Sequence, residues 1–278
     1  MQIWQLIILS VVQGIAELLP ISSSAHVIIT EKLLGLDPTA PQMTLLLVML
    51  HTGTMFAAIV YFWRSWRTTY FSSAGAFRRN ALQVVIATLA TALVGLLLLE
   101  LIKHLVAHGR ADFEIETLFG NARLMAVALF AAGLLIICSA RARSGAAPLT
   151  PRRAAWIGMV QGVCLPFRGF SRSGATISTG MLLGLARRSA EEFSFALAVV
   201  LTPAVVYQEL HRLHKAQALA PQAQSLTHAL APSLLGMLLS FLAGLLALRW
   251  LSRWLEQGRW HYFGIYCLAA ALVVLWIG

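Results

Sequence analysis

Long apolar segments are the feature that most constrains the fold of this chain. Six runs with few or no charged residues reach or approach the roughly 20 residues that a helix needs to cross a bilayer. They are 43–63, 81–102, 124–140, 193–210, 229–250 and 260–277. Charged residues make up 12% of the sequence and the mean hydropathy is +0.76, whereas soluble domains carry about a quarter charged residues. The sequence therefore predicts an all-α integral membrane protein with six transmembrane helices.

Two polar segments interrupt this apolar pattern, and each contains a proline. The first reads QGIAELLPISSSAH (13–26) and the second VQGVCLPFRGFSRSGATISTG (160–180). Because proline removes a helix donor, each segment is predicted to form a broken, re-entrant helical hairpin. Irregular backbone at membrane depth is tolerated only inside protein or along a wet cavity, so we expect both hairpins to point into the helix bundle.

The two polar segments divide the chain into similar halves. The tripeptide VQG occurs at 12–14 and again at 160–162, and three predicted spans follow each copy. Since three is odd, the second copy begins on the opposite side of the membrane, as in the inverted-topology repeats of transporters. We expect one membrane domain over 1–278, with repeat one at about 1–140 and repeat two at about 150–278.

The distribution of basic residues predicts the orientation in the membrane. Thirteen arginines lie on one side of the predicted spans, in 64–79, 141–153, 187–188 and 249–259. The other side carries six basic residues: Lys32, Lys103, Arg110, Arg123, Arg212 and Lys215. The richer side is expected to be cytoplasmic, so the first hairpin opens to the outer face. The net charge of +10 includes no basic patch interleaved with aromatic residues, which argues against nucleic acid as a partner.

The first polar segment carries residues suited to catalysis. Gln13 and Glu17 are four positions apart and share a helix face, and a carboxylate at membrane depth is costly unless it is paired, metal-bound or wet. Ser22 and Ser23 suit the first turn of a new helix, with His26 three or four positions on. These side chains supply a nucleophile with a base, or an anion site at a helix N-terminus, or simple helix caps. The residues alone leave these alternatives open.

The second polar segment repeats the same design around an arginine. Ser171 is expected to cap a helix, and Arg172 keeps its charge at any reachable pH, so it needs an anion. That anion is either Glu17, in a structural ion pair, or a phosphate. The additional hydroxyl donors of Ser173 and Thr176 favour phosphate.

Three further positions carry weaker signals. Gly174 permits close backbone approach, and Arg168 either joins the anion clamp or points toward the cytoplasmic headgroups. His51 lies in the polar quartet HTGT (51–54) within the first predicted span. A histidine there is more often a hydrogen-bonded packing residue than a catalyst, so we favour packing for His51, with a minor role in the site as the alternative.

In this order and spacing, the segments QGIAELLPISSSAH, HTGTMFAAIVYFW and GFSRSGATIS resemble the undecaprenyl-diphosphate phosphatase family, also called the bacitracin-resistance proteins. The resemblance covers nearly the whole chain. It implies an enzyme that removes the terminal phosphate of undecaprenyl diphosphate and recycles the lipid carrier for peptidoglycan and other envelope polymers. Because the family consists of bacterial membrane enzymes, we expect a location in the bacterial cytoplasmic membrane, and the arginine count above predicts an active site open to the periplasm. The sequence leaves the oligomeric state open, a homodimer included.

The resemblance also implies roles for the residues of the first segment. Glu17, together with Gln13, would bind a divalent cation such as Mg²⁺ or Ca²⁺. Ser22 and Ser23 match the serines that follow the family's proline and His26 matches its histidine. Either Ser23 attacks the phosphorus with His26 as its base, or His26 activates water directly.

In the second segment the resemblance implies a grip on the diphosphate. The family motif ends in Ser-Arg-Ser-Gly, which is intact here, whereas an arginine stands where the family has a proline. The residues assigned to diphosphate binding are Ser22 of the first segment and Ser171, Arg172, Ser173, Gly174 and Thr176 of the second, with Arg168 as the departure from the family pattern.

Two rival functions are compatible with parts of this pattern. Inverted repeats with opposed hairpins also build the central sites of carriers, so a flippase for polyprenyl phosphate is the alternative. The type-2 phosphatidate phosphatase fold needs a closing histidine and aspartate pair that the sequence lacks.

Overall fold

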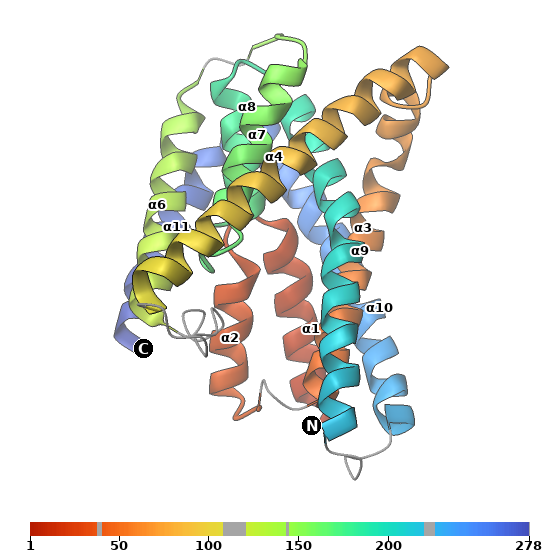
Figure 1. Ribbon diagram of the computed structural model, residues 1–278, viewed down its shortest axis with the longest axis vertical. Helices are drawn as coiled ribbons and strands as arrows, with labels where there is room; N and C mark the ends of the chain where they lie inside the picture. Colours follow the sequence, from red (N-terminus) through yellow and green to blue (C-terminus); the bar gives the residue numbers. More distant parts are fainter. Residues whose placement is uncertain (38–40, 108–120, 143–144, 220–225, 278) are drawn as a thin grey trace. The chain divides into compact units, whose positions relative to one another are not determined.

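Helices account for all the regular structure that the computed structural model describes, in residues 1–37, 41–107, 121–142, 145–219 and 226–277 (Figure 1). The prediction of an all-α protein is confirmed for these residues. The basic residues Arg110 and Arg143, which entered the orientation count, lie outside them. The helices are α1 (Ile3–Leu18), α2 (Ser23–Leu33), α3 (Pro41–Thr69), α4 (Ala74–Ala107), α6 (Ala122–Ala140), α7 (Pro151–Val163), α8 (Arg172–Leu182), α9 (Arg187–Leu219), α10 (Leu226–Glu256) and α11 (Trp260–Ile277).

Five of the six predicted spans coincide with helices that are long and apolar enough to cross a membrane. These stretches are Met43–Thr69, Ala74–Leu105, Ala122–Ala140, Arg187–Tyr207 and Leu230–Glu256. The sixth predicted span is helix α11, whose stretch Trp260–Trp276 is apolar but shorter than the other five. The chain is therefore a multi-pass helical membrane protein.

Both polar segments interrupt the helices, as their prolines predict. Helix α1 ends at Leu18, and Leu19 before Pro20 is extended with ψ 152°, the conformation that a following proline favours. Ser22 then adopts a positive φ of 68°, and α2 begins at the next residue. In the second segment the helix stops at Val163, and Gly169 in the connection has φ 112°, a conformation that suits glycine.

The described residues form two compact units, and each unit combines helices from both halves of the sequence. The first contains Met1–Leu19, His26–Trp63 and Ala198–Leu251, and the second contains Pro20–Ala25, Arg64–Leu197 and Ser252–Gly278. The core of the first unit joins α1, α2 and α3 through Leu6, Leu9, Val27, Met43, Leu46 and Leu50. Apolar side chains on these three helices therefore hold the helix that carries Gln13 and Glu17.

Close contacts between backbones bring α1 and α3 onto α10 in the first unit. A Cβ atom placed on Gly14 would lie 2.6 Å from the carbonyl oxygen of Ser240. The Ser240 hydroxyl donates to the carbonyl of Leu50 on α3 at 3.0 Å. The same hydroxyl and the carbonyl oxygen of Met237 also lie next to Gly53 of α3. Small residues thus let two helices approach the same stretch of α10, a common packing device in membranes.

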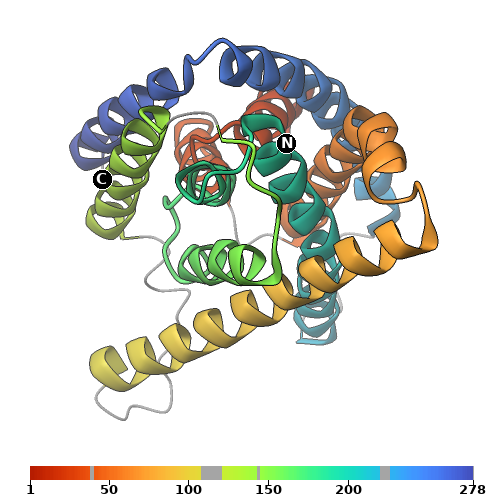
Figure 2. The same ribbon diagram turned by 90° about the horizontal axis from the view of Figure 1, so that it is seen from above.

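The second unit is held together by buried polar contacts as well as by apolar packing. Helix α4 runs along α7, and α6 runs beside α11 (Figures 1 and 2). The hydroxyl of Thr91 donates to the Gly158 carbonyl at 2.9 Å and accepts from Nε2 of Gln161 at 3.0 Å. The hydroxyls of Ser139 and Ser178 lie 2.8 Å apart, and the indole of Trp260 donates toward both. These bonds satisfy polar groups that would otherwise be costly in an apolar interior.

A substitution at Gly162 tests how much the close approach of α7 to α4 contributes to stability in the second unit. A Cβ on this residue would lie 2.8 Å from the Thr91 carbonyl oxygen and 2.8 Å from the Val94 Cβ. We expect Gly162→Ala to destabilise the protein by about 1–3 kcal/mol through overpacking. Thermal unfolding of the purified protein in detergent measures this effect.

Gly75→Ala is the matched control, because the nearest atom to its new Cβ is the Ser73 hydroxyl at 4.0 Å. This substitution adds helix propensity without a clash, so its unfolding midpoint should equal or exceed the wild-type value. Equal midpoints for the two variants would contradict tight packing at Gly162.

Candidate active site

Gln13 and Glu17 occupy one face of α1, as their spacing predicts. Nε2 of Gln13 donates to Oε2 of Glu17 at 3.2 Å. Gln13 is 1% exposed, and the Glu17 side chain is 17% exposed. Burial limits the rotamers of Gln13, so its amide holds the carboxylate in a defined orientation.

Helix α3 adds a residue that the sequence pattern assigned mainly to packing. Nε2 of His51 lies 3.7 Å from Oε2 of Glu17, and Nδ1 of the same ring lies 2.8 Å from the Leu47 carbonyl oxygen. The only sequence signal for this role was a polar residue in an apolar helix. Glu17 is 34 positions away in the sequence, so only the packing of α3 brings the two side chains together.

The start of α2 carries the serines and the histidine of the first segment. Ser22 is 7% exposed and precedes the helix with its positive φ, and Ser23 is the first helical residue. His26 follows three positions later, which places Ser23 and His26 on one side of the helix. The backbone carbonyl of His26 accepts a hydrogen bond from the hydroxyl of Thr30 at 2.7 Å.

The N-terminus of α8 gathers the residues of the second segment. Ser171 is the N-cap, and its hydroxyl accepts from the backbone amide of Gly174 at 3.2 Å. Arg172 is the first helical residue, and Ser173 is 2% exposed. A Cβ on Gly174 would lie 2.9 Å from Cδ1 of Ile136, so a larger residue would require the Ile136 side chain to shift.

Thr176 and Arg168 occupy different positions around this helix start. The hydroxyl of Thr176 donates to the Arg172 carbonyl at 2.8 Å and lies 2.6 Å from the hydroxyl of Ser194, and Thr176 is fully buried. Thr176 thus supports the backbone of the first turn and joins α8 to α9. Arg168 is half-buried in the connection between α7 and α8.

The predicted site residues fall into two sets, one in each unit. Gln13, Glu17 and His26 belong to the first unit. The other set belongs to the second unit and comprises Ser22, Ser23, Arg168, Ser171, Arg172, Ser173, Gly174 and Thr176. The assembly of both sets into one site stays a prediction.

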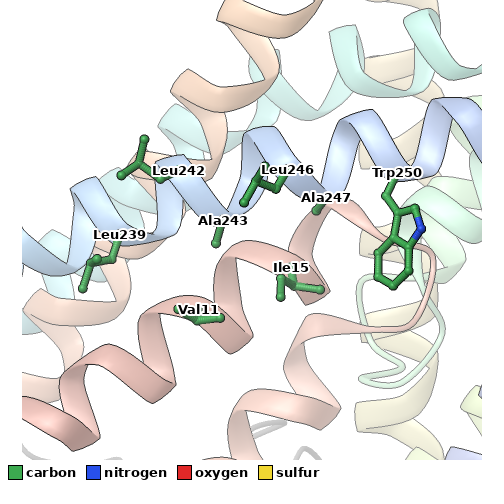
Figure 3. A pocket seen from close by; sticks show the side chains of 8 residues that line it. All are labelled: Val11, Ile15, Leu239, Leu242, Ala243, Leu246, Ala247 and Trp250. Atoms are coloured by element: carbon green, nitrogen blue, oxygen red, sulfur yellow. The ribbon is translucent and has the colours of Figure 1, made fainter.

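An apolar groove with a volume of about 470 Å³ lies between α1 and α10 (Figure 3). Its walls include Val11 and Ile15 of α1 and Trp250 of α10. These α1 positions are two residues away from Gln13 and Glu17, or roughly 200° around a helix of 3.6 residues per turn. The groove therefore lies on the opposite face of α1 from the polar pair.

The donor set around Glu17 fits a divalent cation. Among the described residues no group of three or more histidine, cysteine, aspartate or glutamate side chains gathers in one place. Mg²⁺ nevertheless commonly uses one or two carboxylates, with water and substrate phosphates completing its coordination. The Glu17 carboxylate and the Oε1 atom of Gln13 meet that requirement, the latter after a rotation of the amide.

Substitutions of Thr176 separate a structural role from a direct role in binding. We expect Thr176→Val to lower the free energy of unfolding by about 1–3 kcal/mol, because it leaves the buried Ser194 hydroxyl without this partner. Thr176→Ser keeps the hydroxyl and should retain wild-type stability. Thermal unfolding and Michaelis kinetics of both variants provide the readouts. An increased KM at unchanged stability in Thr176→Val would instead indicate direct contact with substrate.

Comparisons with known proteins identify relatives along the whole chain. The family model described as bacitracin resistance protein BacA matches residues 6–273. The chain is 60% identical over 278 residues to undecaprenyl-diphosphatase 2 of Acinetobacter baylyi, an alignment that covers 99% of this chain and 98% of that protein. It is 36% identical over 291 residues to undecaprenyl-diphosphatase 2 of Burkholderia thailandensis, with 99% and 96% covered. The chain therefore belongs to the BacA family of bacitracin resistance proteins.

Proposed function

We propose that this protein hydrolyses undecaprenyl diphosphate to undecaprenyl phosphate and inorganic phosphate, and so recycles the lipid carrier of peptidoglycan and other envelope polymers. The observation that carries this function is the 60% identity over 99% of the chain to a protein named undecaprenyl-diphosphatase 2. The flippase alternative gains no support from the relatives.

The N-terminus of α8 is suited to the diphosphate. A helix start offers free backbone amides and the positive end of the helix dipole. Arg172 adds a guanidinium that can hold two phosphate oxygens at once, and Ser171 and Ser173 add hydroxyl donors. The hydroxyl of Thr176 donates to the Arg172 carbonyl and so stabilises the first turn of α8. Arg168 contributes a further positive charge in the preceding connection.

In the proposed site Glu17 and Gln13 would hold a divalent cation, Mg²⁺ or Ca²⁺. When bound, the cation neutralises charge that develops on the phosphoryl oxygens. His26 accepts a proton from the attacking group, and the terminal P–O bond to the bridging oxygen breaks so that undecaprenyl phosphate leaves. The attacking group is either the Ser23 hydroxyl, which would form a phosphoserine that water then hydrolyses, or water itself.

We propose an inverted-topology fold of six spans and two re-entrant hairpins for this reaction. Among the described residues, each half contains a broken helix pair, α1–α2 or α7–α8, followed by three longer apolar helices. Matching glycines support the duplication: Gly14 lies against Ser240 and Ala243 of α10, and Gly162 lies against Thr91 and Val94 of α4. The members of each matching pair are 148 or 149 positions apart in the sequence.

The proposed orientation places the first hairpin at the periplasmic face of the cytoplasmic membrane. The excess of arginines on the opposite side supports this assignment through the positive-inside rule. The lipid tail of the substrate would remain in the bilayer while the diphosphate enters the site. A homodimer is compatible with this arrangement.

Phosphate release from undecaprenyl diphosphate tests the proposed function. We expect Glu17→Gln and Arg172→Lys each to reduce kcat/KM by at least about a hundredfold, since each removes a charge or a bidentate contact at the phosphoryl group. Arg141→Lys is the matched control, because Arg141 is exposed at the end of α6. Wild-type protein that releases no phosphate, with or without Mg²⁺ or Ca²⁺, would exclude the function.

Acid quenching during turnover distinguishes the two routes of attack. If Ser23 attacks, substrate labelled in its terminal phosphate should leave label on the protein, and Ser23→Ala should abolish both label and turnover. Loss of at least about a hundredfold in activity is expected, because the nucleophile is removed. Substantial turnover by a correctly folded Ser23→Ala variant would identify water as the attacking group.

A further inference from the structure

His51 and Glu17 face each other within the first unit, although the sequence pattern favours packing for His51 and the family comparison assigns it no role. Nε2 of the imidazole lies 3.7 Å from Oε2 of the carboxylate. The side chains are 33% and 17% exposed, respectively. The pair is thus accessible to a small ion and sheltered from bulk solvent.

The second ring nitrogen determines what Nε2 can do. Nδ1 lies 2.8 Å from the Leu47 carbonyl oxygen, and a carbonyl oxygen only accepts hydrogen bonds, so Nδ1 carries a proton. In the neutral imidazole Nε2 then presents a lone pair toward Glu17. Metal-binding histidines commonly show this arrangement, in which one nitrogen donates to a backbone carbonyl and the other binds the ion.

The separation of the two atoms fits a bridging ion better than a direct hydrogen bond. Hydrogen bonds from nitrogen to oxygen are about 2.7–3.2 Å long, and the observed distance of 3.7 Å exceeds them. Two ligand bonds of about 2.1 Å each can span up to about 4.2 Å through one ion. A single cation can therefore contact both atoms with little movement of either side chain.

Helix packing holds both partners at this separation. Gly14 on α1 lies against Ser240 of α10, and the Ser240 hydroxyl donates to the carbonyl of Leu50, the residue before His51. Both helices thus rest on the same part of α10. Gln13 adds a hydrogen bond to the Glu17 oxygen that faces His51. The two side chains are positioned by contacts of the kind that support metal ligands.

We propose that Nε2 of His51 is a ligand of the divalent cation held at Glu17. The assignment rests on the proposed function, in which Glu17 binds that cation. It adds one imidazole nitrogen to the oxygen donors assigned above, the Glu17 carboxylate and, after rotation of its amide, Oε1 of Gln13. An imidazole nitrogen favours first-row transition ions over Ca²⁺, which takes oxygen ligands. The site should therefore bind Mn²⁺ more tightly than an all-oxygen site would.

Electron spin-echo envelope modulation of bound Mn²⁺ tests this ligand directly. The full chain is purified in detergent through a tag without histidine, stripped with a chelator and loaded with Mn²⁺. We expect nitrogen-14 modulation in the wild type and its loss in His51→Gln. Because the glutamine supplies oxygen in place of nitrogen, the ratio of Mn²⁺ affinity to Ca²⁺ affinity should fall by at least about tenfold.

His104→Gln is the matched control, since His104 is exposed near the end of α4; its nitrogen modulation should equal that of the wild type. Matching unfolding midpoints verify that the variants are folded. Wild-type protein that binds no Mn²⁺, or binds it without nitrogen modulation, overturns the role of His51. Modulation that persists in His51→Gln overturns it as well.

Phosphate release measured on the same samples keeps this inference separate from the function. Wild-type protein that releases phosphate from undecaprenyl diphosphate, yet shows no nitrogen modulation, loses only the His51 ligand. Wild-type protein with nitrogen modulation that releases no phosphate keeps the ligand and loses the function.

Discussion

An unpaired backbone amide or carbonyl in hydrocarbon costs several kcal/mol, so a helix in a membrane can stop only where other groups take over its hydrogen bonds. This chain stops two helices in apolar surroundings, at Leu18 and at Val163. The thiol of Cys267 donates to the carbonyl of Pro20 at 3.3 Å, and the hydroxyl of Ser171 caps the amide of Gly174. Hydrogen bonds from side chains of other segments, or of the turn itself, thus offset the cost of ending the helices there.

The same interruptions create the helix starts that the proposed chemistry uses. A continuous helix across either segment would bond its amides internally and would offer none to an anion. Because α8 begins at Arg172, the first free amides of the helix belong to the same turn as this arginine. Ser22 holds a positive φ of 68° just before α2, and such backbone outliers often occur at functional sites. The fold and the proposed chemistry therefore depend on the same breaks.

The features set by local sequence were predictable, and those set by contact between helices were not. Apolar length identified five spans, because hydrocarbon thickness fixes how long a helix must be. The prolines predicted where the two helices are interrupted. The four-residue spacing of Gln13 and Glu17 predicted that these two side chains share one face of a helix. The sixth predicted span differs in the structure, where the apolar stretch Trp260–Trp276 is shorter than the other five. The approach of α3 to α1, which brings His51 to Glu17, has no signature in either segment alone.

The contacts of the glycines were likewise not predictable from local sequence. VQG marks both halves of the sequence, but only the structure reveals that each glycine meets a helix from the opposite half, α10 for Gly14 and α4 for Gly162. The two halves are therefore interleaved through their contacts, which explains why each compact unit draws on both.

Ser240 shows why this interleaving matters for the candidate site. Its carbonyl lies against Gly14 of α1, and its hydroxyl donates to Leu50 of α3. One residue of the second half thus positions two helices of the first half, and these helices carry Glu17 and His51. A change in α10 would move both side chains, because interiors packed at this density transmit displacement. The geometry at Glu17 is consequently a property of three helices rather than of the polar segment in which the carboxylate lies.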